Sequence, residues 1–174
     1  MKYLLFVSIV LFLAAGCSPK TLPTSSHKPD NQFWQPQLRD SIQKNTYRIV
    51  FSTEKMSISG IWIVKYMDNS WRGTMVNEFG MKMFDFICTP CACELKNVVA
   101  MMDKWYIKKT IAEDLLFILE IDHPKCNMNR NSIMNNDTLT ITYKKKTLQR
   151  FATGEMVMHN KKRNLRYSFV KMED

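Results

Sequence analysis

Hydrophobic positions alternate with polar ones along most of the chain after residue 45, and this two-residue period predicts β-strands. Within 57–66, for example, Trp62, Val64 and Tyr66 share one face, as in a strand with one side on a core. Strands are predicted at 46–52, 57–66, 71–77, 81–87, 138–144, 153–160 and 165–171. Short polar turns separate the second, third and fourth of these, which predicts an antiparallel meander.

One segment changes period and predicts a helix. From Val98 to Glu120 the apolar residues recur three and four positions apart, with no proline or glycine between them. Either Asn97 or Asp103 is a suitable cap, and a break near Asp103 fits the same pattern. A polar, asparagine-rich loop is expected at 122–137. Because one helix cannot cover a flat sheet of this size, the predicted fold is α+β, mainly β: a strongly curved antiparallel sheet, an open half-barrel, packed around one long helix.

The first residues of the chain do not follow the strand pattern. Lys2 precedes an apolar stretch that ends at Ala15, and small residues then lead to Cys17, as in an export signal. This stretch is shorter than the roughly 20 apolar residues that span a bilayer. We therefore expect a signal peptide at 1–16, an acylated anchor and flexible proline-containing tether at 17–44, and a single domain at 45–174.

The five residues that end at Cys17, Leu-Ala-Ala-Gly-Cys, resemble the lipobox of bacterial lipoproteins. In that family the chain is cleaved before the cysteine, whose sulfur then carries a diacylglycerol. The resemblance implies that Cys17 is the lipid-attachment residue and that acyl chains such as palmitate anchor the protein. Ser18 stands where an aspartate retains some lipoproteins at the inner membrane, so the resemblance implies the cell envelope, at the periplasmic face of the outer membrane.

A second resemblance covers residues 45–172. Its pattern runs Ser-Gly-hydrophobic-Lys, Arg, Glu-x-Gly-x-Lys-x-Phe-Asp-Phe and then a helix with Asp-Leu, and the matching positions are Ser59, Gly60, Lys65, Arg72, Glu78, Gly80, Lys82, Phe84, Asp85, Phe86, Asp114 and Leu115. This pattern resembles a group of small bacterial lipoproteins. That group is similar at fold level to the lipoprotein carrier and receptor proteins of the outer-membrane localisation pathway, which implies a half-barrel with an apolar cavity.

Charge and methionine content bear on the partners of the domain. The chain has a formal net charge of +9, with basic clusters at 144–146 and 161–166, and 13 methionines. The clusters fit either solvated turns or a surface facing phospholipid head groups, and no nucleic-acid partner is expected for an exported chain. The methionines fit either ordinary core filling or an adaptable apolar cavity. The candidate cavity residues are Trp62, Met75, Met83, Phe84, Phe86, Met101, Trp105, Ile111 and Leu115.

Beyond Cys17 the chain has four more cysteines, Cys88, Cys91, Cys93 and Cys126. An even number in an exported protein favours one or two disulfides, with Thr89-Pro90 as a hairpin turn, although the pairing stays open. The alternatives are unpaired thiols, a zinc site that adds Cys126 or His123, and a redox dithiol of Cys88 and Cys91.

The sequence shows no combination of residues typical of catalysis. Its three histidines are scattered, and its five glycines form no phosphate-binding loop. We therefore predict no enzyme, no catalytic residue, no metal and no cofactor. The predicted function is to hold or transfer a lipid or an acylated protein at the outer membrane. The first alternative is a structural or accessory lipoprotein of an envelope complex, and the second is a thiol-disulfide oxidoreductase.

Overall fold

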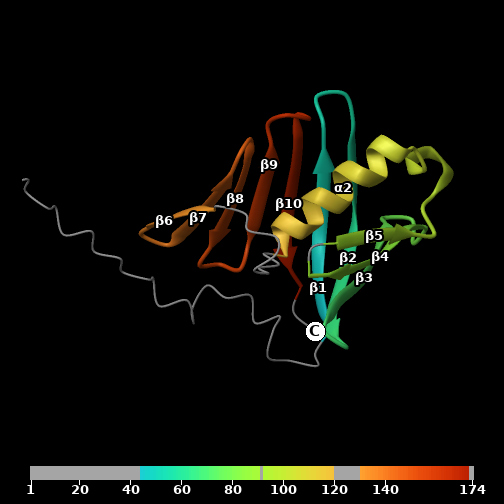
Figure 1. Cartoon of the computed structure of the whole chain (residues 1–174), viewed down its shortest axis with the longest axis horizontal. Coiled ribbons are helices and arrows are strands. Elements are labelled where there is room, and N and C mark those ends of the chain that lie inside the picture. The colour runs from blue at the N-terminus through green and yellow to red at the C-terminus, as the bar shows by residue number, and fades with distance from the viewer. Residues whose placement is uncertain (1–43, 91, 120–129, 173–174) are drawn as a thin grey trace, which may run out of the picture. The chain divides into compact units, whose positions relative to one another are not determined.

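The computed structural model describes residues 44–90, 92–119 and 130–172 (Figure 1). Within these residues the strands are β1 (Asn45–Ser52), β2 (Ser57–Met67), β3 (Ser70–Asn77), β4 (Lys82–Thr89), β5 (Ala92–Lys96), β6 (Asn131–Asn135), β7 (Thr138–Tyr143), β8 (Lys146–Phe151), β9 (Met156–Asn160) and β10 (Leu165–Lys171). A short 3-10 helix, η1 (Ala100–Met102), and one α-helix, α2 (Trp105–Ile118), lie between β5 and β6. All these elements belong to one compact unit, residues 31–174.

The described strands form one antiparallel sheet in the order β5-β4-β3-β2-β1-β10-β9-β8-β7-β6. The first five strands form one meander and the last five a second, and pairing of β1 with β10 joins them in the middle of the sheet. The edge strands β5 and β6 do not pair with each other, so the sheet is not closed. The prediction of a mainly β fold with an antiparallel sheet and one α-helix is confirmed.

All seven predicted strands are present, and the structure adds three that the sequence pattern did not predict. β5 and β8 follow tight turns directly after β4 and β7. β6 lies inside the predicted loop at 122–137, so that prediction is wrong for 131–135. All five residues of β6 are exposed. Its two apolar residues, Ile133 and Met134, are neighbours and so lie on opposite faces, which leaves no alternating pattern from which a strand is recognised.

The helix begins later than predicted and spans 14 residues. The backbone N–H of Val99 donates to the carbonyl of Met83 at 2.8 Å, which holds the chain against β4 and prevents a helix over this segment. The break falls at Asp103 and Lys104, in agreement with the predicted break near Asp103. No side chain caps the first turn of α2. Asp103 instead pairs with Lys108 at 2.6 Å. The predicted helix is therefore wrong for Val98–Lys104.

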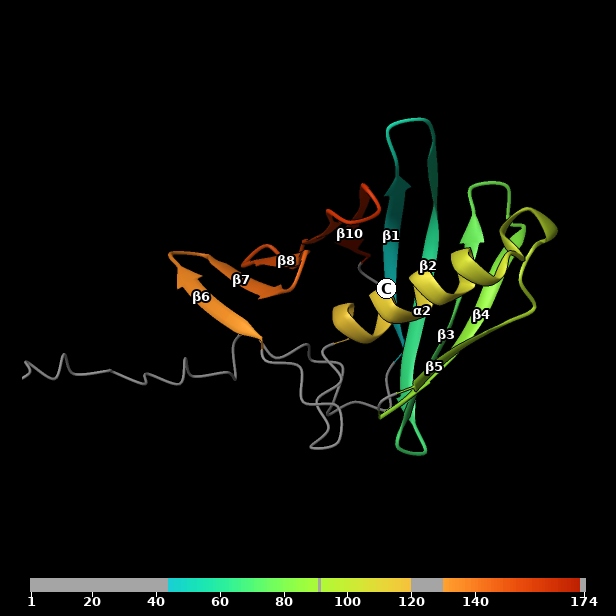
Figure 2. The same ribbon diagram turned by 45° about the horizontal axis from the view of Figure 1, so that its top comes forward.

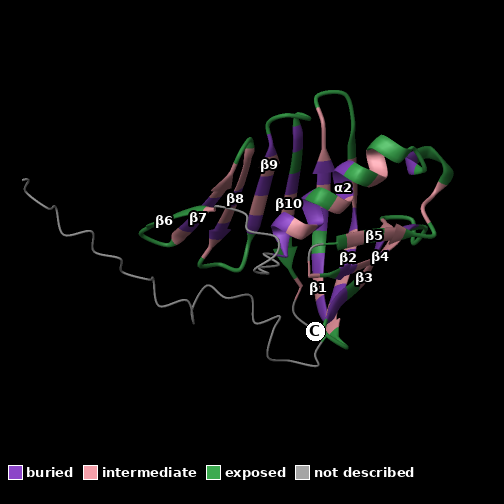
Figure 3. Cartoon of the chain, in the orientation of Figure 1, coloured by how far each residue is buried: buried purple, intermediate pink, exposed green. Residues whose placement is uncertain are grey.

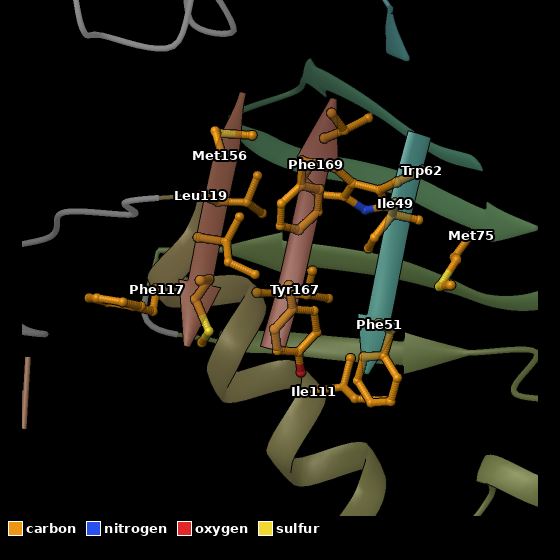
Figure 4. Close-up of a cluster of buried hydrophobic side chains, with 14 of the residues drawn as sticks. Ile49, Phe51, Trp62, Met75, Ile111, Phe117, Leu119, Met156, Tyr167 and Phe169 are labelled. Atoms are coloured by element: carbon orange, nitrogen blue, oxygen red, sulfur yellow. The ribbon is translucent and has the colours of Figure 1, made fainter. Parts of the chain in front are cut away.

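The core lies between α2 and one face of the sheet (Figure 3). Inward positions of the central strands carry large apolar side chains, among them Trp62 and Phe169, whose ring centroids lie 5.1 Å apart (Figure 4). The Trp62 ring also stacks on Phe86, with 5.9 Å between the centroids. Gly73 lies beneath the Phe86 ring, and a Cβ atom there would come within 2.5 Å of that ring and 2.2 Å of the Ile63 carbonyl oxygen. Glycine at this position is therefore a packing requirement of the aromatic cluster.

Ser59 of the Ser-Gly motif and Asp85 of the Phe-Asp-Phe motif form side-chain hydrogen bonds within or next to the first meander. Ser59 is hydrogen-bonded to Glu78 and so joins β2 to the β3–β4 turn. The Asp85 carboxylate accepts hydrogen bonds from Lys82 at 3.1 Å and Asn97 at 2.7 Å. These hydrogen bonds hold the pKa of Asp85 below its ordinary value, although partial burial opposes the shift.

Cys88 and Cys93 face each other across the β4–β5 hairpin. They are direct partners in the strand register, with Cα atoms 4.0 Å apart and sulfur atoms at disulfide distance. The hairpin falls where Thr89-Pro90 predicted a turn, but Thr89 is the last residue of β4 and pairs with Ala92, so the turn lies one position later than predicted. The disulfide therefore ties the edge strand β5 to β4.

We predict that Cys93→Ala lowers the free energy of unfolding under oxidising conditions by about 2 kcal/mol, because this short loop is no longer closed in the unfolded chain. Urea unfolding of the oxidised protein measures the change. Cys91→Ala is the matched control and should leave the stability unchanged. Equal losses for the two variants, or a full loss for Cys91→Ala alone, would contradict the pairing of Cys88 with Cys93.

Candidate functional site

Helix α2 crosses the inner face of the sheet from the β4–β5 side toward β8 and β9 (Figures 1 and 2). Its apolar face includes Ile111, Leu115 and Ile118, all buried. A carboxylate, Asp114, lies on the same face and is 0 % exposed. Two features of the helix–sheet interface follow from this arrangement: a buried polar cluster around Asp114 and an apolar pocket beside it.

The buried polar cluster consists of Asp114, Lys146, Asn160 and Tyr167. The Lys146 ammonium lies 2.7 Å from one Asp114 carboxylate oxygen. The Asn160 amide donates to the two carboxylate oxygens at 2.9 and 3.2 Å, and the Tyr167 hydroxyl donates to one of them at 2.8 Å. Strands β8, β9 and β10 thus each contribute one partner to a single residue of the helix.

Burial dominates the acid–base behaviour of this cluster. Removal from water raises the pKa of the Asp114 carboxyl, and the Lys146 charge and the hydrogen bonds from Tyr167 and Asn160 offset only part of the rise. Burial and the neighbouring carboxylate also raise the pKa of the Tyr167 hydroxyl well above its ordinary value. The Tyr167 hydroxyl therefore acts as a hydrogen-bond donor over the physiological pH range.

Two cations of β8, Lys146 and Arg150, hold the C-terminal part of α2 to this strand. Lys146 donates a second hydrogen bond, at 2.9 Å, to the carbonyl of Glu113. Arg150, also on β8, donates to the carbonyl of Ile118 at 3.1 Å and contacts the Met156 sulfur. Cations near the C-terminal end of a helix interact favourably with its dipole. Strand β8 therefore fixes the last turns of α2 electrostatically.

The apolar pocket lies beside the cluster, between α2 and strands β1 to β4 and β10. It is lined by Ile49, Phe51, Ile58, Trp62, Met75, Met83, Phe84, Met102, Ile111, Leu115, Tyr167 and Phe169. Tyr167 belongs to both features, because its ring lines the pocket while its hydroxyl points to α2 (Figure 4). The cavity measures about 20 Å³, which is room for about one water molecule.

The structure brings together six of the nine predicted cavity residues. Trp62, Met75, Met83, Phe84, Ile111 and Leu115 all line the pocket. Phe86 is buried beside Trp62 without lining it, whereas Met101 and Trp105 lie at the surface, 61 % and 74 % exposed. Among the cysteines, Cys88 and Cys93 form the pair described above, and Cys17, Cys91 and Cys126 lie outside the described residues.

The polar cluster was not among the sites predicted from the sequence. Asp114 occurs in the Asp-Leu motif, but no role was predicted for it, and its partners Lys146 and Asn160 were expected in or beside turns. One signal was available: Asp114 falls on the apolar face of the predicted helix, between Ile111 and Leu115, and a charge at such a position requires a buried partner.

Comparisons with known proteins identify no relative: no family model matches the chain, and no match is found among curated proteins. Within the described residues, no group of three or more potential ligands could hold a metal ion. The helix in that part of the chain is too short to cross a membrane. The resemblances drawn from the sequence therefore stay predictions.

We predict that Asp114→Ala lowers the free energy of unfolding by about 3–5 kcal/mol, because it leaves Lys146, Asn160 and Tyr167 without their buried partner. Urea unfolding measures this change. Glu113→Ala is the matched control, since Glu113 is the adjacent, exposed acidic residue and its removal should cost less than about 0.5 kcal/mol. Similar small losses for both variants would show that the cluster does not hold the helix.

The raised pKa of Asp114 also predicts a pH dependence. The folded carboxyl keeps its proton to a higher pH than the unfolded one, so its stabilising contribution is complete below pH 3.8 and is lost as the pH rises through the folded pKa. The free energy of unfolding of the wild type minus that of Asp114→Asn should therefore fall as the pH rises from 3.8 through the folded pKa of Asp114. Urea unfolding at a series of pH values measures it, and a difference that grows with pH would show that the Lys146 charge outweighs burial.

Proposed function

We propose that this chain is a non-enzymatic lipoprotein, anchored to the outer membrane through Cys17, that holds or transfers a lipid or an acylated protein. The observation that carries the proposal is the pocket under α2, whose lining side chains are apolar apart from the hydroxyl of Tyr167 and the indole N–H of Trp62. Three of these side chains are the buried methionines Met75, Met83 and Met102, whose unbranched, polarizable chains adapt to the shape of an apolar ligand.

In this proposal the sheet acts as a curved half-barrel and α2 as its movable cover. A cavity of about 20 Å³ is far smaller than an acyl chain, so binding requires α2 and the methionines to move. Movement of α2 away from the sheet would lengthen the contacts of Asp114 with β8, β9 and β10. The polar cluster would then return the helix to a defined position after the ligand leaves.

A structural or accessory role in an envelope complex is the second candidate. It is favoured by the same small cavity, since a filled core needs no ligand. An oxidoreductase role has less support, because the Cys88 side chain is fully buried and pairs with Cys93 and not with Cys91.

We predict that the purified unit of residues 31–174 binds a fluorescent fatty acid and that Ile111→Phe weakens this binding by at least about tenfold, because the larger ring fills the pocket. Fluorescence titration and mass spectrometry of extracted lipid are the measurements. Met101→Phe is the matched control, because Met101 lies outside the pocket and is exposed, so its binding should equal that of the wild type.

The two candidates give different results in this experiment. A wild-type domain that carries no lipid and binds no fatty acid, while its thermal unfolding is normal, would exclude the lipid-holding role and leave the accessory role. Equal binding by Ile111→Phe and the wild type would show that the ligand occupies another surface.

A further inference from the structure

The two ends of the sheet differ in charge. One end, here called the basic end, carries the β1–β2 turn (53–56), the β3–β4 turn (78–81), the β7–β8 turn (144–145) and the β9–β10 turn (161–164). These turns contain six cations, Lys55, Lys144, Lys145, Lys161, Lys162 and Arg163, against two anions, Glu54 and Glu78, a sum of +4.

The turns at the opposite end of the sheet carry a net negative charge. Its turns are β2–β3 (68–69), β4–β5 (90–91), β6–β7 (136–137) and β8–β9 (152–155). They contain Asp68, Asp137 and Glu155 and no lysine or arginine, a sum of −3. The two basic clusters of the sequence therefore lie at the same end because of the topology, and the turns at the two ends of the sheet differ in net charge.

Contacts connect the turns of the basic end into one rim. The Lys161 N–H donates to the carbonyl of Lys145 at 2.9 Å, which joins the β7–β8 and β9–β10 turns. Asn164 donates to Glu54 at 2.5 Å and so joins the β9–β10 and β1–β2 turns. In Figure 2 the β1–β2 and β3–β4 turns both lie at the top of the sheet. The segment that leads into α2 is attached close to the β3–β4 turn, since the Val99 N–H donates to the carbonyl of Met83 at 2.8 Å.

The basic end also exposes large apolar side chains. Phe79, at the tip of the β3–β4 turn, is 92 % exposed, and Met56 and Met81 are about half exposed. Trp105, the first residue of α2, lies at the surface next to the exposed Lys104. Aromatic side chains beside lysines are typical of surfaces that enter the interfacial region of a bilayer.

We propose that the basic end is a docking surface for an anionic phospholipid bilayer, with its lysines on the head groups and Phe79 and Trp105 in the interface. Charge complementarity favours this occupant, because such a surface attracts cations and also accepts exposed apolar side chains. The contact goes beyond the proposed function, since it needs neither Cys17 nor a ligand in the pocket. Three pocket-lining residues, Phe51, Ile58 and Met83, each lie two positions from one of these turns, so docking would bring the pocket close to the lipid.

The test uses the unit of residues 31–174, which contains the whole described core and lacks Cys17. Co-sedimentation is measured with vesicles of phosphatidylcholine mixed with phosphatidylglycerol and with vesicles of phosphatidylcholine alone. The domain should bind only the anionic vesicles, and added salt should weaken the binding. Wild-type protein that does not bind the anionic vesicles would overturn the proposal without affecting the fatty-acid test of the pocket.

Charge variants separate docking from general attraction. Lys161→Glu/Lys162→Glu should reduce the affinity by at least about 25-fold, since each cation near an anionic surface contributes about fivefold. Lys65→Glu/Lys171→Glu changes the net charge equally at the other end of the strands and should bind nearly as the wild type does. Equal losses in the two variants would overturn the proposal.

Apolar variants test insertion. Phe79→Ser should weaken binding about tenfold, because a buried phenyl ring no longer contributes. Met67→Ser, in the acidic-end turn region, is the matched control and should have no effect. A salt-sensitive dimer that forms without vesicles and disappears in Lys161→Glu/Lys162→Glu would assign the basic end to the acidic end of a second copy, and would overturn the membrane assignment.

Discussion

The arrangement of the helix depends on one buried carboxylate. Asp114 reaches the sheet from the inner face of α2 and has contacts at 2.7 to 3.2 Å with side chains of β8, β9 and β10. Removing a charge from water is costly, so this group is tolerated only where all its partners are in place. A purely apolar interface would allow the helix to slide or rotate, whereas the polar cluster fits only one position. The location of the pocket follows from that position.

The remaining features follow from how the two meanders meet. Pairing of β1 with β10 places the second meander, with Lys146 and Arg150 on β8, under the C-terminal half of a helix that starts above the first meander. The same pairing brings the two lysine-rich turns to the end of the sheet that holds Phe79. A single connection thus accounts for the fixed helix, the pocket beneath it and the unequal charge of the two ends.

The strands predicted from the sequence are those in which buried apolar residues alternate with more exposed ones. β1, β2 and β10 each present apolar residues at every second position, and their strands are close to the predicted ranges. β8 was missed because its inward positions are Leu148 and Arg150, so a cation interrupts the apolar period. The late start of α2 depends on a backbone hydrogen bond between Val99 and Met83, which no local pattern reveals.

The candidate site was predicted only in part, because a local pattern reveals apolar residues on regular elements but not contacts between distant segments. Apolar residues on regular elements, such as Met75 and Ile111, line the pocket as their periodicity suggests. Met101 and Trp105 were assigned to the pocket because the helix was expected to include them, and they are exposed because it does not. The partners of Asp114 come from strands 30 or more positions along the chain, as the separations of 46 and 53 residues to Asn160 and Tyr167 show. Such pairings depend on the register of the sheet, which the sequence alone does not define.

Photo-crosslinking with a diazirine-labelled fatty acid tests the central claim, that the space beneath α2 is the ligand site, most directly. After irradiation of the unit of residues 31–174 and proteolysis, mass spectrometry locates each adduct. The account predicts adducts on pocket residues such as Met75, Met83 and Leu115, and their loss when unlabelled fatty acid competes. Adducts confined to exposed residues such as Met101 or Ile133, unchanged by competitor, would contradict it.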